Sequence, residues 1–97
     1  MTRLVLAPRA FEDLERLANV LLDTDPAAAL ATGEVLIAGL GILETHPLVG
    51  RPAGEGLREL VISRGRSGYV ALYDYDVMTD TALVLAIRHQ REGGHGD

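Results

Sequence analysis

The chain has 97 residues, of which 47 % are hydrophobic, and carries a formal net charge of −5. This length fits one folded domain with a single core, and the composition is that of a globular protein. The chain contains no cysteine, which excludes disulfides and thiolate metal ligands and agrees with a reducing cytoplasm. The acidic charge argues against a general nucleic-acid-binding protein, because such proteins are normally basic.

The charges are unevenly distributed along the chain. Residues 1–50 contain three Arg and seven acidic residues, whereas residues 51–72 contain four Arg and two acidic residues. Every basic side chain other than His is an Arg, and the planar guanidinium group suits carboxylate and phosphate partners. The C-terminal half is therefore the part of the chain that we expect to bind a macromolecule.

The N-terminal half predicts one short strand and two helices. Residues 2–6 form an apolar run typical of an edge strand, and Pro8 suits the first turn of a helix. Asp25 and Pro26 have the residue types of an N-cap and a first helical position, so a second helix begins there. It is expected to run to Thr45, before His46. In the first helix, apolar residues recur at helical spacing: Phe11, Leu14, Leu17, Ala18, Leu21 and Leu22.

The second helix is apolar on nearly all sides. Residues 27–43 are similar to a membrane span, but they contain Glu34 and fall short of about 20 residues, so we predict no membrane segment. Residues 4–7 are too short for the apolar core of a signal peptide. A helical hairpin packed on a sheet accounts for most of the apolar surface of the helix, and a contact with a partner or a second copy is the alternative for the rest.

The C-terminal half predicts a three-stranded meander. Residues 47–56 read as a loop, and strands are expected at 57–63, 69–76 and 81–88. Their short connections favour antiparallel hairpins. The predicted fold class is α+β, with an N-terminal strand and a two-helix hairpin on a small antiparallel sheet. Residues 1–92 would form the single domain, and residues 93–97 a disordered tail.

Strand alternation separates two sets of side chains on this sheet. One apolar set is expected to face the helices: Val70, Leu72, Leu83, Leu85 and Ile87. The opposite face would carry Tyr69, Tyr73, Tyr75 and Arg88, and Arg58 and Arg64 can join it. Aromatic rings beside Arg can stack on bases and hold phosphates, although packing within the sheet is the alternative role of the tyrosines.

No motif for a metal, a cofactor or a nucleophile is present. The three histidines lack the spacing of metal ligands, and Gly65 and Gly68 lie in a hairpin rather than in a phosphate-binding loop. Ser63 and Ser67 lack the flanking residues of a nucleophile elbow. A single His, here His89, does not make a catalytic set without an acidic partner.

Five segments together give the chain a resemblance to the ParE/RelE superfamily of toxins of bacterial type II toxin–antitoxin modules, also called plasmid stabilisation proteins. The segments are LAPRAFEDLERL, HPLVGRP, LREL, SGYVALYDY and AIRHQRE. None is specific alone, but their order and spacing cover nearly the whole chain. The fold of this superfamily, two N-terminal helices on an antiparallel sheet, agrees with the elements above.

The resemblance implies one of two activities. RelE-like toxins cut mRNA in the ribosome with basic side chains, whereas ParE-like toxins inhibit DNA gyrase. This chain has Val70 where an Arg usually follows the Tyr of SGY, and Val61 and Ser63 where some relatives place Lys. Arg91 matches a basic catalytic position, but no terminal Tyr follows Glu92. Loss of one donor to a developing charge costs on the order of 10²-fold in rate.

We therefore favour a ParE-like toxin that inhibits gyrase, is not an enzyme, and is neutralised when a cognate antitoxin orders on its surface. Its expected target-binding residues are Arg58, Arg66, Tyr69 and Tyr73. The alternative is a ribosome-dependent endoribonuclease whose catalytic cations would be Arg64, Arg66, Arg88, His89 and Arg91. A member that only binds its antitoxin is a third reading. The sequence leaves open whether the chain forms a homodimer or a heterotetramer with the antitoxin.

Overall fold

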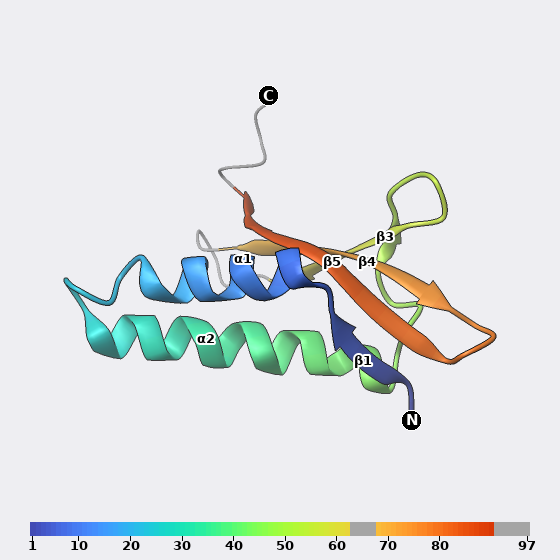
Figure 1. The fold of residues 1–97 in the computed structure, drawn as a ribbon, viewed down its shortest axis with the longest axis horizontal. Coiled ribbons are helices and arrows are strands. Elements are labelled where there is room, and N and C mark those ends of the chain that lie inside the picture. Colours follow the sequence, from blue (N-terminus) through green and yellow to red (C-terminus); the bar gives the residue numbers. More distant parts are fainter. Residues whose placement is uncertain (63–67, 91–97) are drawn as a thin grey trace.

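The computed structural model describes residues 1–62 and 68–90 (Figure 1). Two helices lie side by side and pack on one face of a five-stranded sheet. The predicted α+β fold is confirmed. The predicted tail 93–97 lies outside the described residues. In chain order, the elements are β1 (Arg3–Leu6), α1 (Pro8–Asn19), α2 (Pro26–Gly41), the 3₁₀ turn η1 (Ile42–Glu44), β2 (Arg51–Pro52), β3 (Arg58–Ile62), β4 (Tyr69–Asp76) and β5 (Thr81–His89).

The sheet has the strand order β1-β5-β4-β3-β2. The predicted meander is confirmed, because β3, β4 and β5 pair antiparallel in sequence order. β1 instead pairs parallel with β5, from Arg3 opposite Thr81 to Leu6 opposite Val84, so the sheet as a whole is mixed. The helices and three strands separate β1 from β5 along the chain, and no hairpin therefore fixes their relative direction.

The start of α2 follows the prediction. The Asp25 carboxylate accepts a hydrogen bond from the N–H of Ala28 at 3.1 Å, and Pro26 takes the first helical position. Near its other end, α2 approaches β3 closely at Gly39. A Cβ at this position would lie 2.8 Å from Cγ2 of Ile62, so a glycine is needed for the observed packing.

Residues Pro26–Glu44 form a helical segment that could cross a membrane by length and composition, with a mean hydropathy of 1.7. Leu36, Leu40 and Leu43 of this segment are buried in the core between the helices and the sheet. Leu30 and Ile37, which are 67 % and 61 % exposed, lie outside the core. Core helices of folded domains satisfy the same length and hydropathy criteria, so this property alone is weak evidence for a membrane segment.

The predicted assignment of side chains to the two faces of the sheet is largely wrong. The helices cover the opposite face of β4 from the one predicted. Ala71 and Tyr73 lie on this covered face and are both 0 % exposed in the core. Leu72 lies opposite Ala86 while Tyr73 lies opposite Val84, which leaves Leu85 as a β-bulge. The bulge resets the alternation along β5, so Ala82, Val84 and Ile87 all face the helices. Of the five residues expected there, only Ile87 belongs to this core.

Candidate functional site

The face of the sheet opposite the helices, here called the open face, carries a network of three charged side chains. Oε1 of Glu59 on β3 accepts a hydrogen bond from Nε of Arg51 on β2 at 3.2 Å. Oε2 of the same carboxylate lies 3.7 Å from Nη2 of Arg88 on β5. The sheet register explains this arrangement. Arg51 is directly opposite Glu59 on the neighbouring strand. Across β4, Glu59 is in line with Ala86 of β5, and Arg88 lies two residues further along β5. One carboxylate therefore bridges two guanidinium groups.

Among the residues that the structure describes, this network leaves the open face with little excess positive charge. Arg51 and Arg88 share Glu59, and their neighbours in the register include Val61, Val70 and Leu72. A phosphate on this face would compete with the Glu59 carboxylate and would meet its negative charge at close range. Exposed ion pairs of this kind contribute about 0–1 kcal/mol to stability, so their main effect here is on what the face can bind.

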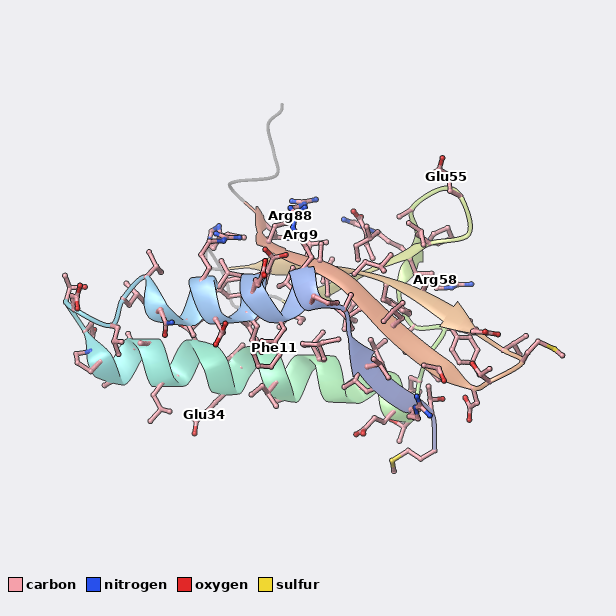
Figure 2. All side chains as sticks on the ribbon, in the orientation of Figure 1. Arg9, Phe11, Glu34, Glu55, Arg58 and Arg88 are labelled. Atoms are coloured by element: carbon pink, nitrogen blue, oxygen red, sulfur yellow. The ribbon has the colours of Figure 1, made fainter. Side chains whose placement is uncertain are left out.

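A second group of arginines lines a recess of about 310 Å³ between α1 and β5. Beyond Leu6, β1 no longer covers β5, and the carboxylate of Asp13 replaces it: Oδ2 accepts a hydrogen bond from the N–H of Ile87 at 2.9 Å. Nε of Arg9 and Nη2 of Arg16 lie 3.7 and 3.6 Å from the two oxygens of Asp13. Arg88 completes the lining of the recess, close to Arg9 in Figure 2.

His89 ends β5 beside Tyr69 of β4. The two residues are cross-strand neighbours, and their rings meet edge to face with centroids 5.2 Å apart. Tyr69 is half-buried and packs against the core, which is the packing role considered as the alternative to base stacking. Arg64, Arg66 and Arg91, three other predicted site residues, lie outside the described residues.

Tyr73 and Arg58 hold the loop that precedes the sheet. The Tyr73 hydroxyl donates to the carbonyl of Pro47 at 2.7 Å and accepts from the N–H of Gly50 at 2.9 Å. Nη1 of Arg58 donates to the carbonyls of Gly50 at 2.8 Å and Leu48 at 3.3 Å. The expectation that Tyr73 lies on an exposed surface is wrong, because the core covers its ring and the loop satisfies its hydroxyl. It has no exposed surface with which to contact a target.

A third polar cluster, which the sequence did not indicate, joins the N-terminus to the turn between β4 and β5. The hydroxyls of Thr2 and Tyr75 donate to Oδ1 of Asp80 at 2.7 and 2.8 Å. The Thr2 bond, followed by the Tyr75 bond, lowers the pKa of Asp80 below its usual value. The same bond to Asp80 raises the pKa of Tyr75. Asp80 has a φ of 51°, a conformation that Asp adopts more readily than most residues, so the cluster serves the turn.

Metal ligation finds no support within residues 1–62 and 68–90, where no group of three or more His, Asp or Glu side chains could hold an ion. The polar groups of this part of the chain are arranged for ion pairs and backbone hydrogen bonds.

Residues 4–93 match the family model described as "ParE toxin of type II toxin-antitoxin system, parDE". The chain belongs to this toxin family. It is 35 % identical over 92 residues to Toxin RelE3 of Caulobacter vibrioides, an alignment that covers 95 % of this chain and 98 % of that protein. The resemblance seen in the sequence to ParE/RelE toxins is thus confirmed, and the protein is a toxin of a type II toxin–antitoxin system.

Solved structures of this superfamily share the fold of the toxin. A chain of the chromosomal ParDE system of P. aeruginosa is similar with a TM-score of 0.75 and 20 % identity, covering 92 % of the toxin and 96 % of that chain. A chain of the intact E. coli RelBE toxin–antitoxin complex is similar with a TM-score of 0.65 and 16 % identity, covering 90 % and 94 %. Because ParDE and RelBE structures both match, the fold alone does not distinguish between a ParE-like and a RelE-like target.

Proposed function

We propose that this toxin acts in the cytoplasm by inhibiting DNA gyrase and does not cleave RNA. The main support is the position of Glu59 between Arg51 and Arg88 on the open face. Cleavage of a phosphodiester requires cations aimed at the charge that develops on the phosphate. Here a carboxylate already occupies the space between the two guanidinium groups, and Val61 and Val70 stand where further cations would be useful.

The matching family model is described as a ParE toxin, and the resemblance seen in the sequence implies gyrase inhibition for the ParE-like members of this superfamily. Inhibition by binding requires a stable surface complementary to the enzyme and no acid–base set. Tyr73 was expected to face outward and is instead part of the core. Of the predicted target-binding residues that the structure describes, Arg58 and Tyr69 remain partly exposed.

A cognate antitoxin neutralises the toxin in this proposal. The solved structures that share its fold are toxin–antitoxin systems and complexes by their titles. The toxin also exposes apolar side chains along α2, including Leu30 and Ile37. Apolar surface of this kind fits an antitoxin segment that orders as it binds.

Supercoiling by purified gyrase tests the proposal directly. The toxin alone should prevent gyrase from supercoiling a relaxed plasmid, and addition of the antitoxin encoded beside it should restore the activity. In cells, production of the toxin without the antitoxin should arrest growth and relax plasmid DNA. Growth arrest with unchanged supercoiling, both in cells and with the purified enzyme, would contradict a gyrase target.

The second candidate is a ribosome-dependent endoribonuclease. It is favoured by the similarity to a protein named RelE3 and by the position of Arg88 and His89 together at the end of β5. Toeprinting on translating ribosomes distinguishes the two activities. Cleavage of mRNA in the ribosomal A site that is lost in Arg88→Ala or Arg91→Ala would overturn the gyrase proposal, whereas intact mRNA at inhibitory toxin concentrations would support it.

A further inference from the structure

The face of α1 that carries Arg9, Asp13 and Arg16 lies against the end of β5. These residues have i, i+4 and i, i+3 spacing, so they share one side of the helix. β1 pairs with only the first part of β5, and further along the Asp13 carboxylate bonds to the N–H of Ile87. This contact sets α1 next to Arg88, the following residue of β5. Arginines from the two ends of the chain thereby line one recess of about 310 Å³.

Positive charge exceeds negative charge among the described residues that line this recess. The lining holds three guanidinium groups and one carboxylate, that of Asp13. The side chain of Asp13 is only 10 % exposed, whereas that of Arg9 is 77 % exposed. An anion that arrives from solvent therefore meets the guanidinium groups before it meets this carboxylate. On the open face, in contrast, the Glu59 carboxylate lies between the two arginines that it pairs with.

The contact between Arg9 and Asp13 is a loose ion pair. Nε of Arg9 lies 3.7 Å from Oδ2 of Asp13, which is longer than a hydrogen bond, and the same oxygen already accepts from the N–H of Ile87. Nη2 of Arg88 is likewise 3.7 Å from Oε2 of Glu59. A guanidinium group has several N–H donors in a fixed fork. Arg9 and Arg88 can therefore bond to an additional anion while they keep the ion pairs that orient them.

We propose that this recess binds the carboxylate of an Asp or Glu side chain of the toxin's protein target, an inference that rests on the function proposed above. Arg9 on α1 and Arg88 on β5 each donate to the incoming carboxylate, and Asp13 holds α1 in position against β5. Guanidinium groups match a carboxylate in geometry, and hydrogen bonds between charged groups are stronger than neutral ones. Because α1 and β5 are already in contact, the arginines need not be brought together when the target binds.

A nucleic-acid strand fits the same recess less well than a single acidic side chain does. Glu12 and Glu15 are exposed on α1, next to the arginines of that helix, and Glu59 lies beside Arg88 on the sheet. A strand presents further phosphates on both sides of any one that is bound, and these phosphates would meet the carboxylates. One carboxylate on a protein surface avoids most of this repulsion.

Inhibition of gyrase by two toxin variants tests the role of the recess. Arg9→Gln removes one guanidinium group from the recess, and Arg3→Gln makes the same change of charge at an exposed position of β1 outside it. Arg9→Gln should raise the toxin concentration needed for half-maximal inhibition of supercoiling by about three- to fivefold, as expected for one exposed ion pair. Arg3→Gln should raise it by less than about twofold. Equal inhibition by the two variants and the unmodified toxin would overturn the proposal.

Titration of the toxin with a small carboxylate tests the chemistry of the ligand without gyrase. N-acetylglutamate amide should shift the NMR signals of the Nε–H groups of Arg9 and Arg88 more than that of Arg3. N-acetylglutamine amide, which has the same size and no charge, should leave all three signals in place. Shifts at Arg9 and Arg88 that a short single-stranded DNA produces at lower concentration than the carboxylate does would assign the recess to nucleic acid, contrary to the proposal.

The outcomes separate this proposal from the function on which it rests. If the unmodified toxin leaves gyrase active, the proposed function itself fails. If it inhibits gyrase and Arg9→Gln inhibits equally well, the function stands and the proposal is wrong. Weaker neutralisation of Arg9→Gln by the antitoxin, with unchanged inhibition of gyrase, would assign the recess to the antitoxin. Larger shifts in the titration of Glu92→Gln would assign it to a carboxylate of the chain's own C-terminal residues, and both results would overturn the proposal.

Discussion

The hydroxyl of Tyr73 joins two backbone groups of the loop before β2, accepting a hydrogen bond from Gly50 at 2.9 Å and donating one to Pro47 at 2.7 Å. Tyr73→Phe would leave a buried N–H without its partner, which we expect to lower the free energy of unfolding by about 1–3 kcal/mol. Chemical denaturation measures the change. Tyr75→Phe is the control: its hydroxyl bonds to exposed Asp80, which water can satisfy, so its effect should be smaller. Equal losses in the two variants would contradict this account.

The same contact makes Gly50 intolerant of any side chain. A Cβ at Gly50 would lie 2.6 Å from Cε1 of Tyr73 and 2.8 Å from the carbonyl oxygen of Glu59, which is fixed in β3. Gly50→Ala should therefore lower the free energy of unfolding by about 1–3 kcal/mol through overpacking. A Cβ at Gly41, in contrast, meets no atom within 4 Å in a helical backbone, so Gly41→Ala should be neutral or stabilising by up to about 1 kcal/mol. Thermal melting of both variants checks the opposite signs.

We expect Asp13 to stabilise the fold mainly through its hydrogen bond to the edge of β5, and less through its ion pairs. Asp13→Ala leaves the buried N–H of Ile87 without an acceptor, at a cost of about 1–3 kcal/mol in unfolding free energy. Asp13→Asn keeps an acceptor oxygen and should cost less, although it loses the ion pairs with Arg9 and Arg16. Glu12→Ala, an exposed change on the same helix, should be nearly silent. Amide exchange at Ile87 should accelerate in the Ala variant, and an equal loss in Asn and Ala variants would show that the charge dominates.

The helices and the meander could be predicted because their signals are local. Asp25 and Pro26 mark the start of α2 by their own chemistry, and the short connections between the last strands fix their antiparallel order. The side-chain faces could not be predicted in the same way. The bulge at Leu85 resets the alternation along β5, and nothing in the residues around it marks that position.

The contacts of the candidate site were harder still to predict, because they depend on how the strands are aligned in the sheet. The sequence shows Arg58 and Glu59 as neighbours, yet they act on opposite faces: Arg58 bonds to the loop before β2, and Glu59 bridges Arg51 and Arg88. The burial of Tyr73 depends in turn on the loop that its hydroxyl holds. Such relationships join residues that are far apart in the chain, so composition and spacing alone do not reveal them.

The cluster around Asp80 predicts a defined pH dependence. Hydrogen bonds from Thr2 and Tyr75 lower the pKa of Asp80 from 3.8, so its contribution to stability is present above pH 3.8 and is lost as the pH falls through the lower folded-state value. Asp80→Asn, which tolerates the same positive φ, should melt below the unmodified toxin at pH 7. The difference between their melting temperatures should shrink below pH 3.8. A difference that stays constant down to pH 2 would contradict the role of the charged carboxylate.

The raised pKa of Tyr75 acts at the other end of the pH scale. Because its pKa lies above 10.0 in the folded state, the contribution of Tyr75 is fully present below pH 10.0 and is lost as the pH rises through the folded-state value. Tyr75→Phe should therefore flatten the decline in melting temperature that begins as the pH rises above 10.0. An unchanged alkaline decline would assign it to other groups.

Glu59→Gln tests whether this carboxylate keeps phosphate off the open face. The substitution releases Arg51 and Arg88 from their shared partner, so the affinity for a short single-stranded RNA should rise by about two- to fivefold at low salt. Fluorescence anisotropy measures it. Glu55→Gln changes the net charge equally at an exposed position in the loop between β2 and β3, labelled in Figure 2, and should have a smaller effect. If both variants bound RNA equally well, Glu59 would not be what excludes phosphate, and the gyrase proposal would lose its main structural support.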